Sequence, residues 1–134
     1  MIKKNIIIFM PTLDYGGGVE KNFFIITNYL STKFKKITVV TLSQSVKTKL
    51  SNKVNIICPK ISLIHHLGRR LRFIVALVYL LQTILVNKKP TVFCFQGIIY
   101  CTLLCKIIGT KVIVRSNSSP SGWSNNFIKT ILYK

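Results

Sequence analysis

The stretch NIIIFMPTLDYGGGVEKNFFIITNYL, residues 5–30, decides the fold of this chain. Its first part, residues 5–11, is a continuous apolar run that ends at Pro11, the pattern of a strand buried on both faces of a parallel sheet. Gly16, Gly17 and Gly18 then lead into residues 19–34, where apolar side chains recur at helical spacing. The stretch therefore predicts a strand, a glycine-rich loop and a helix in direct succession.

The same alternation continues along the chain. We expect further strands at residues 36–42, 54–58, 91–95 and 111–115, and further helices at residues 67–86 and 98–108, the latter closed by Gly109. Another amphipathic helix begins near Phe127 and its pattern stops after two turns, which indicates a truncated or split chain. The element order predicts an α/β fold, a Rossmann-like, doubly wound, mostly parallel sheet that forms one domain over residues 1–134.

Composition limits the classes of protein. The chain has 134 residues, with 20 Lys or Arg against 2 acidic residues, a net charge of +18 and a hydrophobic fraction of 49%. An apolar fraction this high supports a core and argues against disorder. The two acids are Asp14 and Glu20, so a metal site around His65 and His66 would lack ligands. We therefore expect no metal and no cofactor.

Targeting signals are not apparent. The N-terminal apolar run, residues 6–10, is shorter than a signal-peptide core, and the longest apolar stretch, residues 73–86, is shorter than the roughly 20 residues of a spanning helix. All four cysteines lie in apolar segments, and Cys101 and Cys105 are expected to be small core residues. These features predict a cytoplasmic protein.

The candidate site follows from the fold class. In doubly wound sheets ligands bind at the carboxyl ends of the strands, which selects residues 12–20, 96–97 and 115–123. The glycines let the backbone approach a ligand closely, and amides at a helix start attract phosphate. However, Lys21 replaces the last glycine of the dinucleotide fingerprint and no Gly-Lys-Ser/Thr is present. A flexible turn without a ligand therefore remains an alternative.

Two side chains near the end of the chain suit particular ligands. Arg115 can pair with phosphate oxygens in a bidentate manner, the alternative being a solvated charge at a strand end. Trp123 can stack on a sugar face or contact lipid, the alternative being packing beneath its loop.

Taken in order, four segments resemble the family 4 glycosyltransferases. The stretch quoted above is similar to the opening strand, Gly-Gly loop and helix of that family, and KITVVTLS (residues 36–43) resembles its next strand. KKPTVFCFQG (residues 88–97) resembles the Lys-Pro-Asp-Val-Val strand, with Thr91 in place of Asp, and KVIVRSNSSP (residues 111–120) resembles a later strand and loop. The resemblance covers nearly the whole chain.

This resemblance implies the amino-terminal, acceptor-side half of a GT-B enzyme used in polysaccharide biosynthesis. Its partners would be a nucleotide-sugar donor and a glycan or lipid-linked acceptor, with no specific nucleic acid. The surplus of Lys and Arg would suit association with anionic lipid at the inner face of the membrane, the alternative being a dispersed, solvated basic surface. Gly16, Gly17 and Gly18 would lend amides to the donor diphosphate. Substrate contacts would come from the remaining candidates: Asp14, Glu20, Gln96, Arg115, Asn117 and Trp123.

The resemblance also implies that the chain is incomplete as an enzyme. The family's paired glutamates lie in a donor-binding domain, and this chain has Glu20 as its one glutamate. Asn117 takes the place of a histidine found in many relatives, and an amide cannot act as a base. We therefore assign no catalytic residue. The alternative function is a non-catalytic basic module that binds anionic membrane or nucleic acid.

Overall fold

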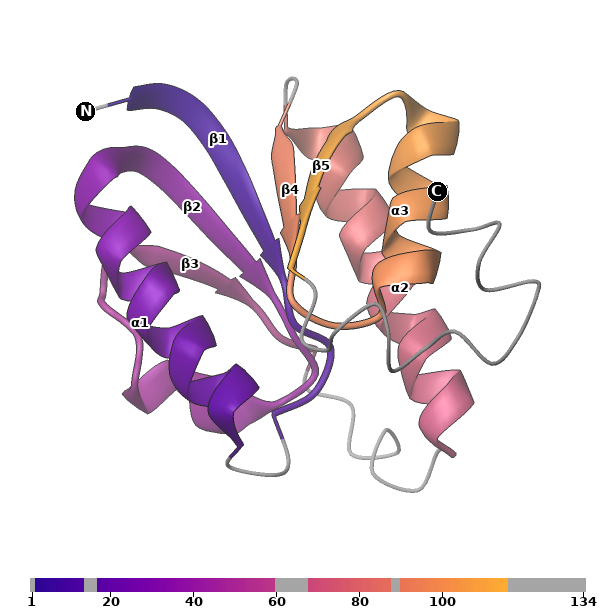
Figure 1. Cartoon of the computed structure of the whole chain (residues 1–134), viewed down its shortest axis with the longest axis horizontal. Helices are drawn as coiled ribbons and strands as arrows, with labels where there is room; N and C mark the ends of the chain where they lie inside the picture. The colour runs from indigo at the N-terminus through magenta and orange to yellow at the C-terminus, as the bar shows by residue number, and fades with distance from the viewer. Residues whose placement is uncertain (1, 14–16, 60–67, 88–89, 116–134) are drawn as a thin grey trace, which may run out of the picture.

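A single parallel sheet organises the chain (Figure 1). The structure, a computed structural model, describes residues 2–13, 17–59, 68–87 and 90–115. The sheet has five strands in the order β3-β2-β1-β4-β5, and every neighbouring pair is parallel. The strands are β1 (Ile2–Phe9), β2 (Phe34–Val40), β3 (Val54–Ile57), β4 (Thr91–Cys94) and β5 (Lys111–Val114). The prediction of a Rossmann-like, doubly wound α/β fold is confirmed.

Helices cover both faces of this sheet (Figure 1). The first helix, α1 (Gly18–Lys33), packs on one face, whereas α2 (Arg69–Val86) and α3 (Ile98–Ile108) pack on the other. The apolar run of β1 explains this arrangement, because alternate side chains of a strand point to opposite faces. Ile6 and Ile8 belong to the core beneath α1, and Ile7 and Phe9 belong to the core beneath α2 and α3.

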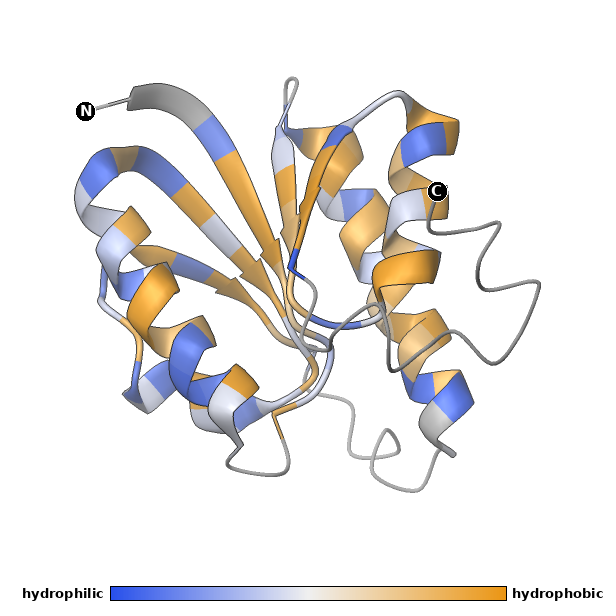
Figure 2. Cartoon of the chain, in the orientation of Figure 1, coloured by the Kyte–Doolittle hydropathy of each residue, from blue (hydrophilic) through white to orange (hydrophobic). Residues whose placement is uncertain are grey.

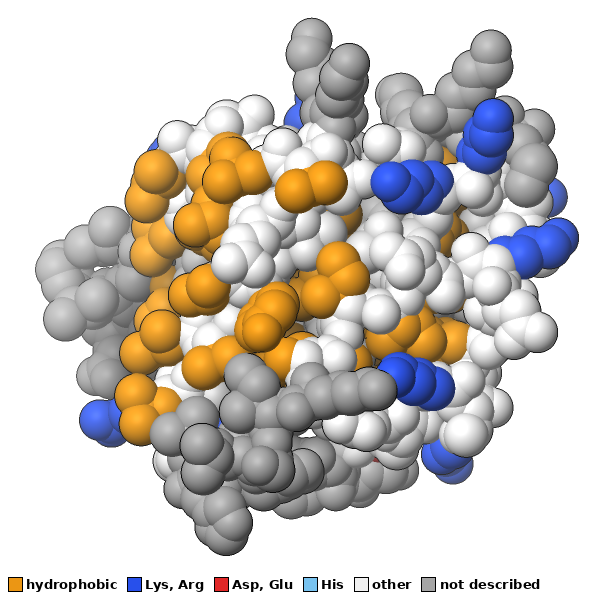
Figure 3. Space-filling model, turned by 180° about the vertical axis from the view of Figure 1, so that it is seen from behind, with side chains coloured by type: hydrophobic (Ala, Val, Ile, Leu, Met, Phe, Trp, Pro, Cys, Tyr) orange, Lys and Arg blue, Asp and Glu red, His pale blue; other side chains and the backbone are white. Residues whose placement is uncertain are grey.

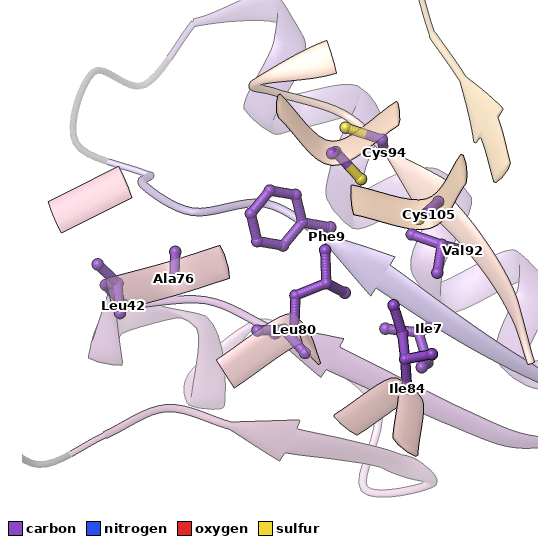
Figure 4. Packing of buried hydrophobic residues seen from close by; sticks show 11 residues of the cluster. Ile7, Phe9, Leu42, Ala76, Leu80, Ile84, Val92, Cys94 and Cys105 are labelled. Carbon is purple, nitrogen blue, oxygen red and sulfur yellow. The ribbon is translucent and has the colours of Figure 1, made fainter. Parts of the chain in front are cut away.

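In the core beneath α2 and α3, side chains of β1 pack directly against side chains of α2. Phe9 from β1 lies beside Leu80 of α2, and Ile84 of α2 lies beside Ile7 (Figure 4). Figure 2 shows the hydrophobic residues running along the central strands and the helices that cover them. Burial of this kind stabilises a domain by about 25 cal/mol per Å² of apolar surface. Because β1 contributes side chains to the cores on both faces, its uninterrupted apolar run stabilises both helical layers.

Many element boundaries differ from the sequence prediction by one to three residues, and two of the differences are informative. β1 begins at Ile2 instead of Asn5, and β2 begins at Phe34, which the helical pattern of residues 19–34 includes. Phe34 donates its backbone N–H to the Leu30 carbonyl while its own backbone is already extended, so α1 passes into β2 without a loop. Its apolar side chain fits both the helical and the strand pattern, which is why periodicity misplaced the junction.

The segment predicted as a loop at residues 43–53 contains a short 3₁₀ helix, η1 (Gln44–Thr48). Its Val46 is fully buried beneath α1. Asn28 of α1 holds the segment by donating to the Lys49 carbonyl and accepting from the Ser51 N–H at 2.9 Å. The sequence pattern does not predict this helix, because Val46 is its one apolar side chain and its other residues are polar. The expected loop at residues 116–124, the helix near Phe127, and His65 and His66 lie outside the described residues.

Three cysteines, one from β4 and two from α3, form a buried thiol cluster where α3 packs on the sheet. Cys94, Cys101 and Cys105 are fully buried, as predicted for the last two. The hydrogen bond with Cys105 favours the thiolate of Cys101, but contact with Cys94 and burial outweigh it and raise the pKa of Cys101. The hydrogen bond with Cys101 and burial raise the pKa of Cys105. Both thiols therefore stay protonated in the folded protein under ordinary conditions.

The raised pKa values predict a loss of stability in alkaline solution. Unfolded thiols ionise near pH 8.5, whereas Cys101 and Cys105 in the folded chain do not, so above that pH the unfolded state binds fewer protons and stability falls. We expect each thiol to contribute a slope of about 1.4 kcal/mol per pH unit above about pH 9. Urea denaturation between neutral and alkaline pH measures the slope, and Cys105→Ala should reduce it. An unchanged slope in that variant would contradict the assignment.

Candidate functional site

The direction in which the chain adds strands to the sheet reverses between β1 and β4. From β1 the chain proceeds to β2 and β3 on one side, and then to β4 and β5 on the other. Phe9 is paired with Val40 and Cys94, and Cys94 is paired with Val114, so the ends of these four strands lie level. Figure 1 shows the arrowheads converging at this edge. Such a switch point is where open α/β sheets bind their ligands.

Hydrogen bonds join the loops that leave these strands. The Thr12 hydroxyl after β1 donates to the Gln96 side-chain oxygen after β4 at 3.3 Å. The backbone N–H of Leu13 donates to the Ser43 hydroxyl, which follows β2, at 3.0 Å. Three strands therefore contribute to one connected rim. The loop after β1 lies in the middle of this rim, and Gln96, where sequence analysis expected a substrate contact, lies at its β4 end.

A hydrogen bond to its backbone and a tight turn after it also position Gln96. The buried Cys94 thiol donates to the Gln96 carbonyl at 3.0 Å. Gly97, which follows, has φ +70° and caps α3, and a Cβ placed there would collide with the ring of Phe73 from α2. The tight turn at Gly97 therefore sets where Gln96 leaves β4.

The start of α1 supplies backbone donors at the same edge. Gly17 accepts hydrogen bonds from the N–H groups of Glu20 and Lys21, and among the described residues no side chain caps the helix. Gly17 has an ordinary extended backbone, with φ −80°, and a Cβ at Gly17 or Gly18 would meet nothing within 4 Å. Neither strain nor packing within the described chain requires glycine there. One reason for glycine at these two positions remains, which is that it lets a ligand approach the helix amides closely.

Arg115 provides the positive charge of the site. It follows β5 directly, and its backbone N–H donates to the Cys94 carbonyl at 3.1 Å. The guanidinium lies 5.9 Å from the ring centre of Phe95, and that ring packs edge-on against Phe23 of α1 at 5.5 Å. Arg115 is therefore on the same face of the sheet as α1, across about 10 Å from the end of β1 at the usual strand spacing.

One atom of Arg115 is left without a partner. Its Nη1 is buried, and within the described part of the chain it has no hydrogen-bond partner. Buried polar atoms are nearly always satisfied, and an exception calls for an explanation such as a missing ion. A guanidinium prefers a carboxylate or phosphate as a bidentate partner. The geometry of Arg115 thus fits an anionic ligand.

The structure brings together five of the predicted site residues at this edge: Gly17, Gly18, Glu20, Gln96 and Arg115. Asp14, Gly16, Asn117 and Trp123 lie outside the described residues. Of the residues that hold the rim, Thr12 lies within the segment 12–20 that sequence analysis selected, but it was given no role there, and Ser43 and Cys94 were missed. Ser43 comes just after a predicted strand, so its position was a usable signal, whereas the Cys94 thiol was concealed by its apolar surroundings.

The groups at this edge combine hydrogen-bond donors with side chains of both charges. They are the backbone amides at the start of α1, the Gln96 amide, the Arg115 guanidinium and the Glu20 carboxylate in the first turn of α1. The backbone amides and the guanidinium suit an anionic ligand. In the described ranges no cluster of three or more His, Cys, Asp or Glu residues could hold a metal ion. Comparison with protein-family models, with curated proteins and with solved structures finds no match to this chain.

Proposed function

We propose that this chain is the acceptor-side domain of a glycosyltransferase that moves a sugar from a nucleotide-sugar donor to a polysaccharide or lipid-linked oligosaccharide. The observation that carries the proposal is the buried Nη1 of Arg115, which has no hydrogen-bond partner among the described residues and lies at the strand-end edge that holds the switch point of a Rossmann-like sheet. The ordered resemblance of four segments to family 4 glycosyltransferases supports the same class.

The role of the site in transfer is electrostatic. The amides of Gly17 and Gly18 and the guanidinium of Arg115 would stabilise the negative charge that develops on the leaving nucleoside diphosphate. The rim formed by Thr12 and Gln96 offers polar groups to a sugar hydroxyl. Among the described residues, the rim formed by Thr12, Ser43 and Gln96 carries no group suited to proton transfer, and we assign no such role to Glu20 at the start of α1. Acid-base chemistry and donor specificity would come from a donor-binding domain.

The test is a transfer assay. The full protein that contains this chain is incubated with a panel of nucleotide sugars and with glycan and lipid-linked acceptors. Sugar transfer to any of these acceptors is the expected result. Binding of diphosphate without any transfer would overturn the proposal and would favour the non-catalytic basic module.

Replacing Arg115 provides a sharper prediction. Arg115→Gln removes a charge-assisted hydrogen bond of about 1.5–3 kcal/mol, so we expect the affinity for inorganic pyrophosphate to fall about tenfold or more. Lys111→Gln is the matched control, because it removes one exposed positive charge from the opposite end of the same strand. Isothermal titration calorimetry measures both. Equal losses in the two variants would show that net charge alone attracts the ligand.

A further inference from the structure

Two helices expose apolar side chains on their outer surfaces. On α2 these are Leu71, Ile74, Val78, Leu85 and Val86, and on α3 they are Tyr100, Leu103 and Ile107. The spacing of three and four residues places each set on one side of its helix. The exposed fractions are large, reaching 84% at Val86 of α2 and 82% at Ile107 of α3. The outer surfaces of both helices are therefore apolar where a surface helix is normally polar.

These two surfaces form one continuous region, which we call the α2–α3 face. The helices lie side by side on the same side of the sheet, and Phe73 of α2 pairs with Tyr100 of α3 at 6.2 Å between ring centres (Figure 1). Val114 of the edge strand β5, on the same face of the strand as Val112 in the core beneath α3, is exposed as well. Figure 3 shows hydrophobic side chains gathered over the half of the molecule that carries these elements. Exposed patches of this kind mark contact sites.

The charges around the α2–α3 face have one sign. Both acids of the chain, Asp14 and Glu20, precede α2 in the sequence, so residues 68–115 contain no carboxylate side chain. Exposed cations stand next in sequence to the apolar side chains, Arg70 beside Leu71 and Lys106 beside Ile107. A complementary partner must be apolar in the middle and negative at its rim.

A bilayer with anionic headgroups has this combination. A second copy of the chain does not, because a net charge of +18 makes two copies repel each other. Nucleic acid supplies negative charge but offers no surface for a stripe of aliphatic side chains, since its binding depends on phosphate contacts and stacking. In the described part of the chain, no helix is long and apolar enough to cross a membrane.

We propose that the α2–α3 face lies flat on an anionic lipid bilayer. The aliphatic side chains of α2 and α3 enter the boundary between headgroups and acyl chains, and the bordering lysines and arginines pair with lipid phosphates. The inference uses residues that take no part in the switch-point site, so it stands independently of the proposed transferase function.

Vesicle flotation tests the apolar contribution. The full chain is mixed with vesicles of phosphatidylcholine alone or of equal parts phosphatidylcholine and phosphatidylglycerol. The double variant Ile74→Ser/Ile107→Ser should lower the partition coefficient on the anionic vesicles about tenfold or more, because two large aliphatic side chains no longer enter the bilayer. The control Ile25→Ser/Tyr29→Ser removes two exposed apolar side chains from α1, on the opposite face, and should have little effect.

The charge contribution has its own pair of variants. Arg70→Gln/Lys106→Gln should weaken binding about fivefold for each charge at low salt, whereas Lys21→Gln/Lys33→Gln on α1 should weaken it less. Circular dichroism verifies that the exposed substitutions leave the fold intact. Equal binding to both vesicle types, equal losses in test and control variants, tighter binding to duplex DNA, or a dimer that Ile74→Ser/Ile107→Ser dissociates would each overturn the proposal.

Discussion

Gly97→Ala should lower the free energy of unfolding by about 3 kcal/mol, the largest single effect on stability that we expect. Gly97 has φ +70°, which costs any residue with a Cβ roughly 1–2 kcal/mol. The new methyl group would also overlap the Phe73 ring, which packs against Tyr100. Displacing a packed side chain adds about 1–3 kcal/mol. Urea denaturation monitored by circular dichroism gives the difference.

Gly109→Ala separates the two causes. Gly109 has φ +72° and caps the other end of α3, but a Cβ there would meet nothing within 4 Å. It should therefore cost only the backbone term, about 1 kcal/mol. Adding Phe73→Ala to Gly97→Ala should recover part of the steric cost, as a double-mutant cycle reveals. Equal destabilisation by Gly97→Ala and Gly109→Ala would show that Phe73 does not limit this turn.

Gly17→Val should abolish most ligand binding without affecting stability. The branched side chain would stand where an anion approaches the amides of α1, so we expect pyrophosphate affinity to fall about tenfold and sugar transfer about a hundredfold. The fold should tolerate it, because the backbone of Gly17 is extended and a Cβ meets nothing within 4 Å. Calorimetric titration and thermal unfolding of the same sample measure both quantities.

Gly68→Val is the matched control for this substitution. Gly68 precedes α2 as Gly17 precedes α1, it lacks a side-chain cap hydrogen bond, and a Cβ there also meets nothing within 4 Å. Pyrophosphate affinity should be unchanged in this variant. A similar loss of affinity in both variants, or none in Gly17→Val, would remove the glycine loop from the site.

Much of the fold could be predicted because burial leaves a strong pattern in the sequence. The central strand β1 is buried on both faces, so residues 6–10 are uniformly apolar, and the αL cap at Gly109 occupies a position that favours glycine. The junction at Phe34 could not be located, since one apolar residue satisfies a helix and a strand alike. Local patterns therefore identify elements better than their ends.

The site was predictable in its location but not in its connections. The rule that ligands bind at strand ends selected the loops after β1 and β4. The hydrogen bond from Thr12 to Gln96 joins residues 84 positions apart, and nothing local to either residue indicates it. In the same way, the charge of Arg115 was apparent, whereas its placement over Phe95 and the burial of its Nη1 depend on strand order.

The most direct test of the central claim, that the switch point binds the diphosphate of a nucleotide sugar, is amide-resolved NMR of the full chain titrated with inorganic pyrophosphate. The account predicts saturable shifts at the backbone amides of Gly17, Gly18, Gly97 and Arg115, and little change at Gly68. Shifts that follow the exposed lysines across the surface and do not saturate, or none at the glycine loop, would contradict it.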